Sequence, residues 1–428
     1  MSHAELLARH RQVLPSWLAL YYDQPIELVD GKGCRVVDGE GNAYLDFFAG
    51  ILTTMIGYNP PEVVEAIRDQ AGRMLHTSTL YLIRQQVELA ERIAELSGIP
   101  DAKVFFTNSG SEANEAALLL ATTARRSNQV LALRNSYHGR SYAAMGVTGN
   151  RGWSASSFTP VNVSYVHGGY RYRSPFRHLP DDAYIQACVD DLRDVIDTTT
   201  AGQVACMIAE PIQGVGGFTV PPDGLFGAMK EVLDEYGILF VADEVQTGWG
   251  RTGEHFWGYQ AHGIVPDALT FAKGLGNGLP IGGVVARAEL MDGVTANSIS
   301  TFGGNPLVAR GALAVLDHLA AHDLQANART VGARLAAGLR GLAERQPVVG
   351  DVRGKGLMLG VELVEPGSGA PAPAAAAAAQ EQARRGGLLV GKGGLYGNVL
   401  RVAPPLILTE AEADEGLEIL TRAIAALG

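Results

Sequence analysis

The chain has 428 residues, of which 47% are hydrophobic and 18% charged, as is typical of a compact globular protein with a large core. Its formal net charge of −11 argues against nucleic acid or an acidic membrane surface as a partner. The segment Met1–Trp17 carries Glu5 and lacks the apolar run of a signal peptide. No stretch approaches the roughly 20 apolar residues of a membrane span. We therefore expect a cytoplasmic protein.

The cysteines are too few for a disulfide framework in a chain of this length, and each lies in or near apolar sequence: Cys34, Cys188 and Cys206. We expect them to be small core residues. We find no cluster of cysteine and histidine with the spacing of metal ligands, and so expect no metal site.

The first part of the chain, residues 1–59, contains two short apolar segments, Glu27–Asp30 and Cys34–Asp38. Their spacing predicts a hairpin, which we expect to pack on the C-terminal part of the protein. The alternation of apolar runs with helical periods begins only after this region.

Residues 60–310 alternate short apolar strands with helices, and the main predicted elements are strands at Val104–Thr107, Val130–Leu133, Val204–Ala209, Leu239–Asp243, Leu269–Ala272 and Gly282–Ala286, with a helix from Ser111 to about Arg125. Nearly continuous apolar strands separated by helices indicate an α/β domain whose mostly parallel sheet is buried on both faces. Ligands of such sheets bind at the carboxyl ends of the strands.

Residues 311–428 predict a smaller α+β domain. A long helical run from about Asn305 to Leu342 leads into an extended segment at Val352–Val361. The alanine-rich stretch after Pro371 is most simply a loop entering a helix. Strands follow at Leu388–Val390 and Val399–Val402.

The first candidate site residues in chain order are Ser109, Gly110 and Ser111, which follow a strand and open a helix. The unpaired amides of the first helical turn form an anion site suited to a monophosphate. The alternative is an ordinary helix N-cap at Ser111. Tyr137 and His138 follow the next strand, where an aromatic ring can lie over a flat cofactor, although a lone aromatic residue is more often part of the core.

The central pair is Asp243 and Lys273, at the ends of two consecutive apolar strands. Alone, either residue would most simply be a solvated loop residue. Together, the acid can hold a protonated pyridine nitrogen while the lysine forms an imine with the aldehyde of pyridoxal phosphate (PLP). Just beyond the acid, Val245 can pack on the opposite ring face and Gln246 can hydrogen-bond the phenolic oxygen. The polar loop at Thr301 can supply a hydroxyl to the phosphate.

Two further charges stand near this expected edge of the sheet. Arg401 has apolar neighbours on both sides, so we expect it to be partly buried and to need a carboxylate, either a structural one or that of a substrate. Glu210 ends its own strand, and we expect it to pair with Arg401 when no other carboxylate is bound.

The chain resembles the class III aminotransferases in motifs that occur in the same order, namely Asn108–Asn114, Tyr137–Gly139, Glu210–Gly214, Asp243–Gly248, Ala272–Gly274 and Thr301–Pro306. Further stretches resemble the alanine–glyoxylate aminotransferase 2 branch of that family, namely His76–Thr79, His255–Gly258, Gly350–Gly356 and Gly387–Gly391. The short segment Tyr165–Leu179 departs from the relatives, which carry a longer insertion there.

The resemblance implies the PLP-dependent transferase fold type I and a homodimer with active sites shared across the subunit interface; pairing of dimers into a tetramer stays open. It makes Lys273 the Schiff-base lysine and Asp243 the partner of the pyridine nitrogen. Phosphate would be bound by Ser109–Ser111 and by Thr301 of the neighbouring subunit.

By the same resemblance, Tyr137 would stack on the cofactor ring and Gln246 would contact its phenolic oxygen. Arg401 would bind the substrate carboxylate, with Glu210 as its gate.

The expected function is an aminotransferase that moves an amino group from an amino acid or an ω-amine to a 2-oxo acid such as pyruvate or glyoxylate. One alternative is a lyase that eliminates phosphate from a phosphorylated amino alcohol or amino acid on the same scaffold. A second, from a different class, is a PLP-binding protein without catalytic activity. The sequence does not name the donor, the preferred acceptor or the pathway.

Overall fold

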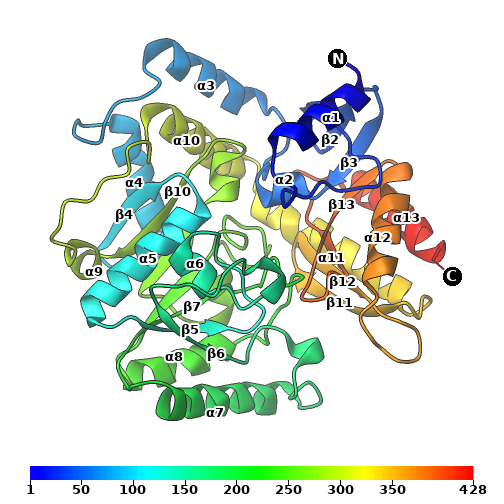
Figure 1. Ribbon diagram of the computed structural model, residues 1–428. Helices are drawn as coiled ribbons and strands as arrows, with labels where there is room; N and C mark the ends of the chain where they lie inside the picture. Colours follow the sequence, from blue (N-terminus) through cyan, green and yellow to red (C-terminus); the bar gives the residue numbers. More distant parts are fainter. Residues whose placement is uncertain (428) are drawn as a thin grey trace.

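The computed structural model describes residues 1–427 and contains two seven-stranded sheets (Figure 1). The first sheet has the strand order β4-β10-β9-β8-β7-β5-β6. Its strands are β4 (Ala102–Thr107), β5 (Gln129–Leu133), β6 (Asn162–Val166), β7 (Val204–Ala209), β8 (Leu239–Asp243), β9 (Ala268–Phe271) and β10 (Gly282–Arg287). Only β10 runs antiparallel to its neighbours, so the sheet is mostly parallel as predicted.

Alternating side chains of this sheet enter two separate apolar layers, as the period of a β-strand requires. In β5, Val130 and Ala132 pack beneath α5 (Gly110–Arg125), while Leu131 and Leu133 join the larger core on the other face. The other helices around this sheet are α3 (Pro61–Arg73), α4 (Arg84–Ser97), α6 (Tyr142–Gly146), α7 (Asp181–Thr199), α8 (Leu225–Glu235), α9 (Ala288–Asp292) and α10 (Pro306–Ala321). Short 3-10 turns lie at η1 (Arg151–Trp153), η2 (Arg171–Arg173), η3 (Gly258–His262) and η4 (Lys273–Gly276).

The second sheet combines strands from both ends of the chain in the order β1-β2-β3-β13-β14-β12-β11. Its strands are β1 (Leu28–Lys32), β2 (Arg35–Asp38), β3 (Ala43–Phe47), β11 (Val349–Lys355), β12 (Met358–Leu363), β13 (Leu388–Gly393) and β14 (Val399–Val402). The predicted hairpin is present as β1 and β2, and β3 joins it to β13 by parallel pairing, Leu45 opposite Leu388.

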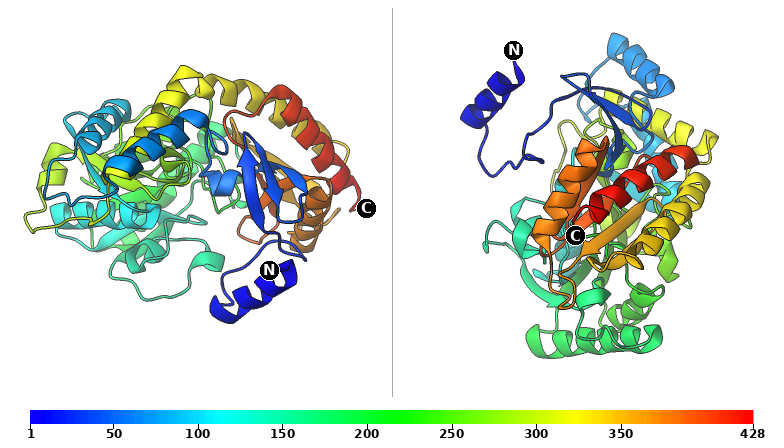
Figure 2. Two further views of the ribbon diagram at one scale, coloured as in Figure 1. Left: turned by 90° about the horizontal axis from the view of Figure 1, so that it is seen from above. Right: turned by 90° about the vertical axis from the view of Figure 1, so that its right-hand side faces the viewer.

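Three helices, α11 (Leu324–Ala343), α12 (Pro373–Arg385) and α13 (Glu410–Ala425), pack side by side on the second sheet (Figure 2). The alanine-rich stretch forms α12, as expected. The short α2 (Ala49–Leu52) leads from β3 toward the first sheet. The N-terminal α1 (His3–Val13) has no buried residue and stands apart from both sheets in Figure 2.

One predicted element is wrong in its extent. The helical run expected from Asn305 to Leu342 is two helices, α10 and α11, separated at His322 and Asp323. Asp323 has a left-handed φ of 44° and its carboxylate caps the amide of Ala326, which starts a new helix in a new direction. The helical period of the sequence continues across this break and therefore hides it.

The three cysteines are buried and free, which confirms them as core residues. No helix within residues 1–427 is long and apolar enough to cross a membrane.

Candidate active site

The charged and polar residues predicted for the site meet at the carboxyl ends of the parallel strands. Asp243 ends β8, Glu210 follows β7 directly and Lys273 follows β9 after a single residue. Lys273 has a left-handed φ of 46°, because the chain turns there from β9 into η4. Consecutive parallel strands thus bring an acid and a lysine, far apart in sequence, to the same edge.

The Asp243 carboxylate is 4% exposed and held by three donors. Its Oδ2 accepts from Asn114 Nδ2 at 2.8 Å and lies 2.7 Å from His138 Nδ1, and its Oδ1 accepts from the amide of Val245 at 3.1 Å. Asn114 is itself fixed by the carbonyl of His138 and by the hydroxyl of Thr270. The carboxylate is therefore oriented, and Oδ1 keeps a lone pair for one more donor.

Lys273 as a whole residue is half-buried, and its amine lies among protein atoms beside Asp243. Desolvation lowers the pKa of the Lys273 amine to about 8, against the opposing attraction of Asp243. At neutral pH more of the amine is consequently neutral than in an ordinary lysine, and the neutral form is the one that attacks an aldehyde.

This lowered pKa gives a prediction for the reaction with PLP that the sequence leads us to expect at Lys273, measured on protein prepared without PLP. The rate of its reconstitution with added PLP should rise with pH through a midpoint near 8, because the neutral amine predominates above that pH. An ordinary lysine, with a pKa of about 10.4, would give a rate still rising above pH 9. Stopped-flow absorbance of the PLP band from pH 6 to 10, with a lysine model peptide as control, measures the midpoint. Identical profiles for protein and peptide would contradict the prediction.

The phosphate loop lies where α5 begins. Ser109, not Ser111, is the N-cap, since its hydroxyl accepts from the amide of Glu112 at 3.2 Å. The Ser111 hydroxyl instead accepts from the amide of Arg140 at 3.2 Å, which joins the loop after β5 to the helix start. Gly139, at φ 139°, lies so close that a Cβ there would stand 2.6 Å from the Ser111 hydroxyl.

Gly110, the first residue of α5, touches the segment that carries the acid. A Cβ on Gly110 would lie 3.0 Å from Cγ1 of Val245 and 3.7 Å from Cβ of Ala272. The helix start therefore lies against Val245, the second residue after Asp243, and against Ala272, the residue before Lys273. Tyr137 also belongs to this edge, since its amide donates to Glu210 at 2.8 Å.

Arg401, on β14 of the second sheet, reaches the same edge and is 3% exposed. Its guanidinium lies between the rings of Phe48 and Phe218, with its carbon 5.1 Å and 4.6 Å from the two centroids. Nη2 donates to Gln246 Oε1 at 2.9 Å, and Nε has no acceptor within residues 1–427. Desolvation lowers the pKa of Arg401 to about 10, so it stays charged at neutral pH.

The predicted pairing of Glu210 with Arg401 is wrong for this structure. The Glu210 carboxylate accepts from the amides of Tyr137 at 2.8 Å and Gly214 at 2.7 Å, and it makes no ion pair with Arg401. A backbone amide donates to each of its two oxygens. Gln246 takes the place by Arg401. Burial raises the pKa of the Glu210 carboxyl.

Thr301 stands apart from these residues in the single chain. It is exposed in the turn that precedes α10, next to the exposed Phe302. No residue of its own chain described by the structure hydrogen-bonds its hydroxyl.

Sequence reasoning missed three residues of this site: Asn114, Phe48 and Phe218. Asn114 lies one turn into α5, and its position among the first residues of that helix was the available signal. Phe48 and Phe218 come from two distant loops, and no local pattern distinguishes them from ordinary core aromatics.

These residues fit a pyridine aldehyde phosphate. Asp243 offers an oriented carboxylate with an open lone pair, and Lys273 offers a partly neutral amine. Gly110 and Ser111, the first residues of α5, have backbone amides without a partner inside the helix, and Gly110 lies against Val245 and Ala272.

Comparisons with known proteins agree with this geometry. The aminotransferase class-III family matches residues 20–424. The chain is 41% identical, over 96% of its length and 85% of the relative's, to alanine–glyoxylate aminotransferase 2 homolog 2 of Arabidopsis thaliana. It superposes on a thermostable (S)-enantioselective ω-transaminase from Thermomicrobium roseum with a TM-score of 0.92 and 35% identity, covering 100% and 99% of the two chains.

A phospholyase from Arthrobacter in complex with phosphoethanolamine has a TM-score of 0.90 and 34% identity, with coverage of 99% and 100%. The fold predicted from the sequence is thus confirmed, as is the resemblance to the alanine–glyoxylate branch. The chain belongs to the class III aminotransferase family and is a PLP-dependent enzyme of fold type I.

Proposed function

We propose that the enzyme moves an amino group from an amino acid or an ω-amine to a small 2-oxo acid such as pyruvate or glyoxylate. The observation that carries the acceptor class is Arg401, a buried guanidinium whose only hydrogen-bond partner among residues 1–427 is a neutral amide. A buried cation without a carboxylate is costly, and a substrate carboxylate supplies the missing acceptor. Two aromatic rings hold the guanidinium in position for it.

We assign Lys273 as the residue that binds PLP covalently and carries the proton. Its amine is close enough to neutrality to accept a proton from the donor carbon and to return one to the cofactor carbon. Bound PLP supplies the electron sink for this chemistry. Asp243 keeps the pyridine nitrogen protonated, and Asn114 and His138 hold that carboxylate in place.

The other assignments follow from position. The open amides of Ser109, Gly110 and Ser111 bind the phosphate. Tyr137 and Val245 enclose the cofactor ring. These assignments are supported by two contacts. Gly110 lies against Val245 and Ala272, and the amide of Tyr137 donates to Glu210 at the same edge of the sheet.

In this proposal Gln246 contacts the phenolic oxygen, and its side chain also accepts a hydrogen bond from Arg401. An arriving carboxylate would displace Gln246 from Arg401. Glu210, whose negative charge lies near Arg401, then tempers the cation when a donor without a nearby carboxylate is bound. In this proposal both Gln246 and Glu210, and not Glu210 alone, control the access of a substrate carboxylate to Arg401.

We further propose a homodimer in which Thr301 contacts the phosphate of the second copy. An exposed apolar surface supports it, since Leu80, Tyr81 and Leu82 are 77%, 70% and 98% exposed. The rings of His76 and Phe302 are tilted by 45° with their centroids 5.1 Å apart, which brings the His76 segment beside the Thr301 turn. Apolar surface of this kind marks a protein interface.

The cytoplasm is the proposed location, supported by three cysteines that remain free thiols.

We also propose the divisions 1–59, 60–310 and 311–428, since residues 1–59 contribute β1–β3 to the sheet built otherwise from residues beyond 311.

Spectroscopy tests the reaction. The absorbance of the purified PLP enzyme is recorded after L-alanine, a panel of ω-amines and phosphoethanolamine are each added alone. Conversion of the cofactor to its amine form, reversed by pyruvate or glyoxylate, is the expected result. Release of inorganic phosphate from phosphoethanolamine without any oxo acid would instead establish the phospholyase alternative. The fold that the chain shares with the Arthrobacter phospholyase is the reason to test this alternative.

Replacement of Arg401 by alanine tests the carboxylate assignment. We expect KM for pyruvate to rise by roughly 100-fold, since a charge-assisted hydrogen-bonded pair contributes about 1.5–3 kcal/mol. Turnover of an ω-amine that lacks a carboxylate should change far less in the donor half-reaction. Steady-state kinetics measures both, with the exposed Arg334→Ala as matched control. Unchanged oxo-acid affinity would refute the assignment.

A further inference from the structure

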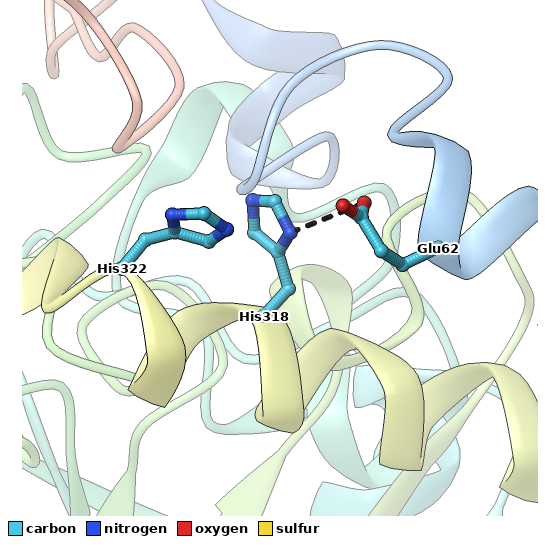
Figure 3. A group of neighbouring side chains, drawn as sticks. All are labelled: Glu62, His318 and His322. Carbon is cyan, nitrogen blue, oxygen red and sulfur yellow. Dashed lines mark ion pairs between the residues drawn. The ribbon is translucent and has the colours of Figure 1, made fainter.

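Two histidines lie on one face at the end of α10, away from the residues of the active site. His318 and His322 are four residues apart, so the helix places them one above the other. Their ring centroids are 4.3 Å apart with an interplanar angle of 45°. Figure 3 shows His322 turning a ring nitrogen toward the His318 ring.

A carboxylate from a second helix completes the group. Glu62 is the second residue of α3, and its Oε2 lies 3.5 Å from Nδ1 of His318 (Figure 3). This separation is too long for a good hydrogen bond. The Nδ1 atom of His318 is buried and has no hydrogen-bond partner within residues 1–427. The His318 side chain as a whole is only 12% exposed. A buried polar atom of this kind calls for a ligand.

We propose that Glu62, His318 and His322 bind a divalent transition-metal ion of the zinc class. Each residue offers one ligand atom, and these atoms lie within 4.8 Å of one another. Imidazole nitrogen together with carboxylate oxygen is a donor set that suits Zn²⁺, Ni²⁺ and Cu²⁺, and less so Mg²⁺ or Ca²⁺. Water would fill the remaining positions.

The geometry requires only a small adjustment. Zinc bonds of about 2.0–2.1 Å place tetrahedral ligand atoms roughly 3.4 Å apart. The Nδ1 to Oε2 distance of 3.5 Å already has about this value, and the His322 ligand atom lies within 4.8 Å of both, so the movement needed is small. Because His322 and Glu62 are exposed, their side chains are free to make that movement.

The sequence predicted no metal site, because it contains no cluster of cysteine and histidine with the spacing of metal ligands. A pair of histidines at the i and i+4 positions was present in the sequence. The third ligand comes from a residue far away, which only the packing of α3 against α10 brings near.

The site lies at a joint between the two sheets. Glu62 follows the segment that crosses from β3 to α3, and His322 stands where α10 gives way to α11 on the second sheet. An ion held by all three side chains would tie the two crossing segments together. We infer that it acts as a structural clip and takes no part in the transfer of the amino group.

Titration of the untagged PLP enzyme with Zn²⁺ tests the proposal. The enzyme is first treated with a chelator, and binding is followed by calorimetry for the wild type, His322→Ala and Glu62→Gln. His178→Ala, which removes an exposed histidine elsewhere, is the matched control. We expect one equivalent bound by the wild type and by the control, and affinity weakened at least roughly 10-fold in the two site variants. Equal isotherms for the wild type and His322→Ala would overturn the proposal.

Two further measurements locate the ion and its effect. Anomalous diffraction from zinc-soaked crystals should give a peak between the three side chains, and peaks elsewhere alone would count against the site. Zinc should raise the unfolding midpoint of the wild type and leave that of His322→Ala unchanged, because binding to the native state stabilises it. Aminotransferase activity serves as the separate readout and should be equal in both proteins, so failure of this proposal leaves the proposed function untouched.

Discussion

Replacement of Lys273 by alanine should lower kcat by roughly 10⁴-fold or more, the upper end of what a general acid–base group contributes. In the proposed mechanism the variant loses both the amine that binds the cofactor covalently and the base that moves the proton. Single-turnover kinetics with L-alanine measures the loss. The variant should still take up PLP, because the amides at the start of α5 and Asp243 remain in place.

Two controls accompany this variant. Lys103→Ala removes a lysine that pairs with Asp292 at the far end of β4 and should leave kcat unchanged. Circular dichroism should show a native fold for Lys273→Ala, since the removed amine makes no hydrogen bond to other residues among 1–427. Activity within 10-fold of wild type would mean that another group moves the proton.

Replacement of Asp243 by asparagine should lower kcat by roughly 10³-fold, comparable to the loss of a preorganised electrostatic contact. The amide is close in size and its oxygen can still accept from Asn114 and His138, but its NH2 group can accept neither from the Val245 amide nor from a protonated pyridine nitrogen. The cofactor then takes up negative charge poorly. KM should change less than kcat, because the contact matters most in the transition state.

The measurement for Asp243→Asn is steady-state kinetics together with the absorbance of the bound cofactor. The exposed Asp181→Asn, which loses only a surface ion pair, is the control. If Asp243→Asn kept full activity with an unaltered spectrum, the assigned partner of the pyridine nitrogen would be wrong.

The parts of the site that the sequence could predict share one physical cause. Asp243 and Lys273 end consecutive buried strands, and parallel strands necessarily bring their carboxyl ends to one edge. The start of α5 could also be predicted from the sequence, since a strand, a polar turn with Gly110 and a helical period follow one another. In each case a local pattern fixed the position.

The parts that could not be predicted depend on packing between distant segments. Arg401 bonds to Gln246, whereas Glu210 accepts from two backbone amides, and both arrangements depend on the conformation of loops distant in sequence. The break at Asp323 rests on a left-handed residue inside a continuous apolar pattern. Strand β6 (Asn162–Val166), which we did not predict, pairs with β5 at the sheet edge and leaves only Val166 of its residues fully buried.

The parallel pairing of β3 with β13 constrains the order in which the protein folds during synthesis. All strands of the first sheet emerge from the ribosome between residues 102 and 287, so that sheet can form early from segments close in sequence. The second sheet has to wait until Leu388 is available to Leu45. Until then the strands β1–β3 present an unpaired edge, which is a hazard for association with other chains. The slow, concentration-sensitive step of refolding should therefore be closure of the second sheet, with Arg401 reaching the active site only at its end.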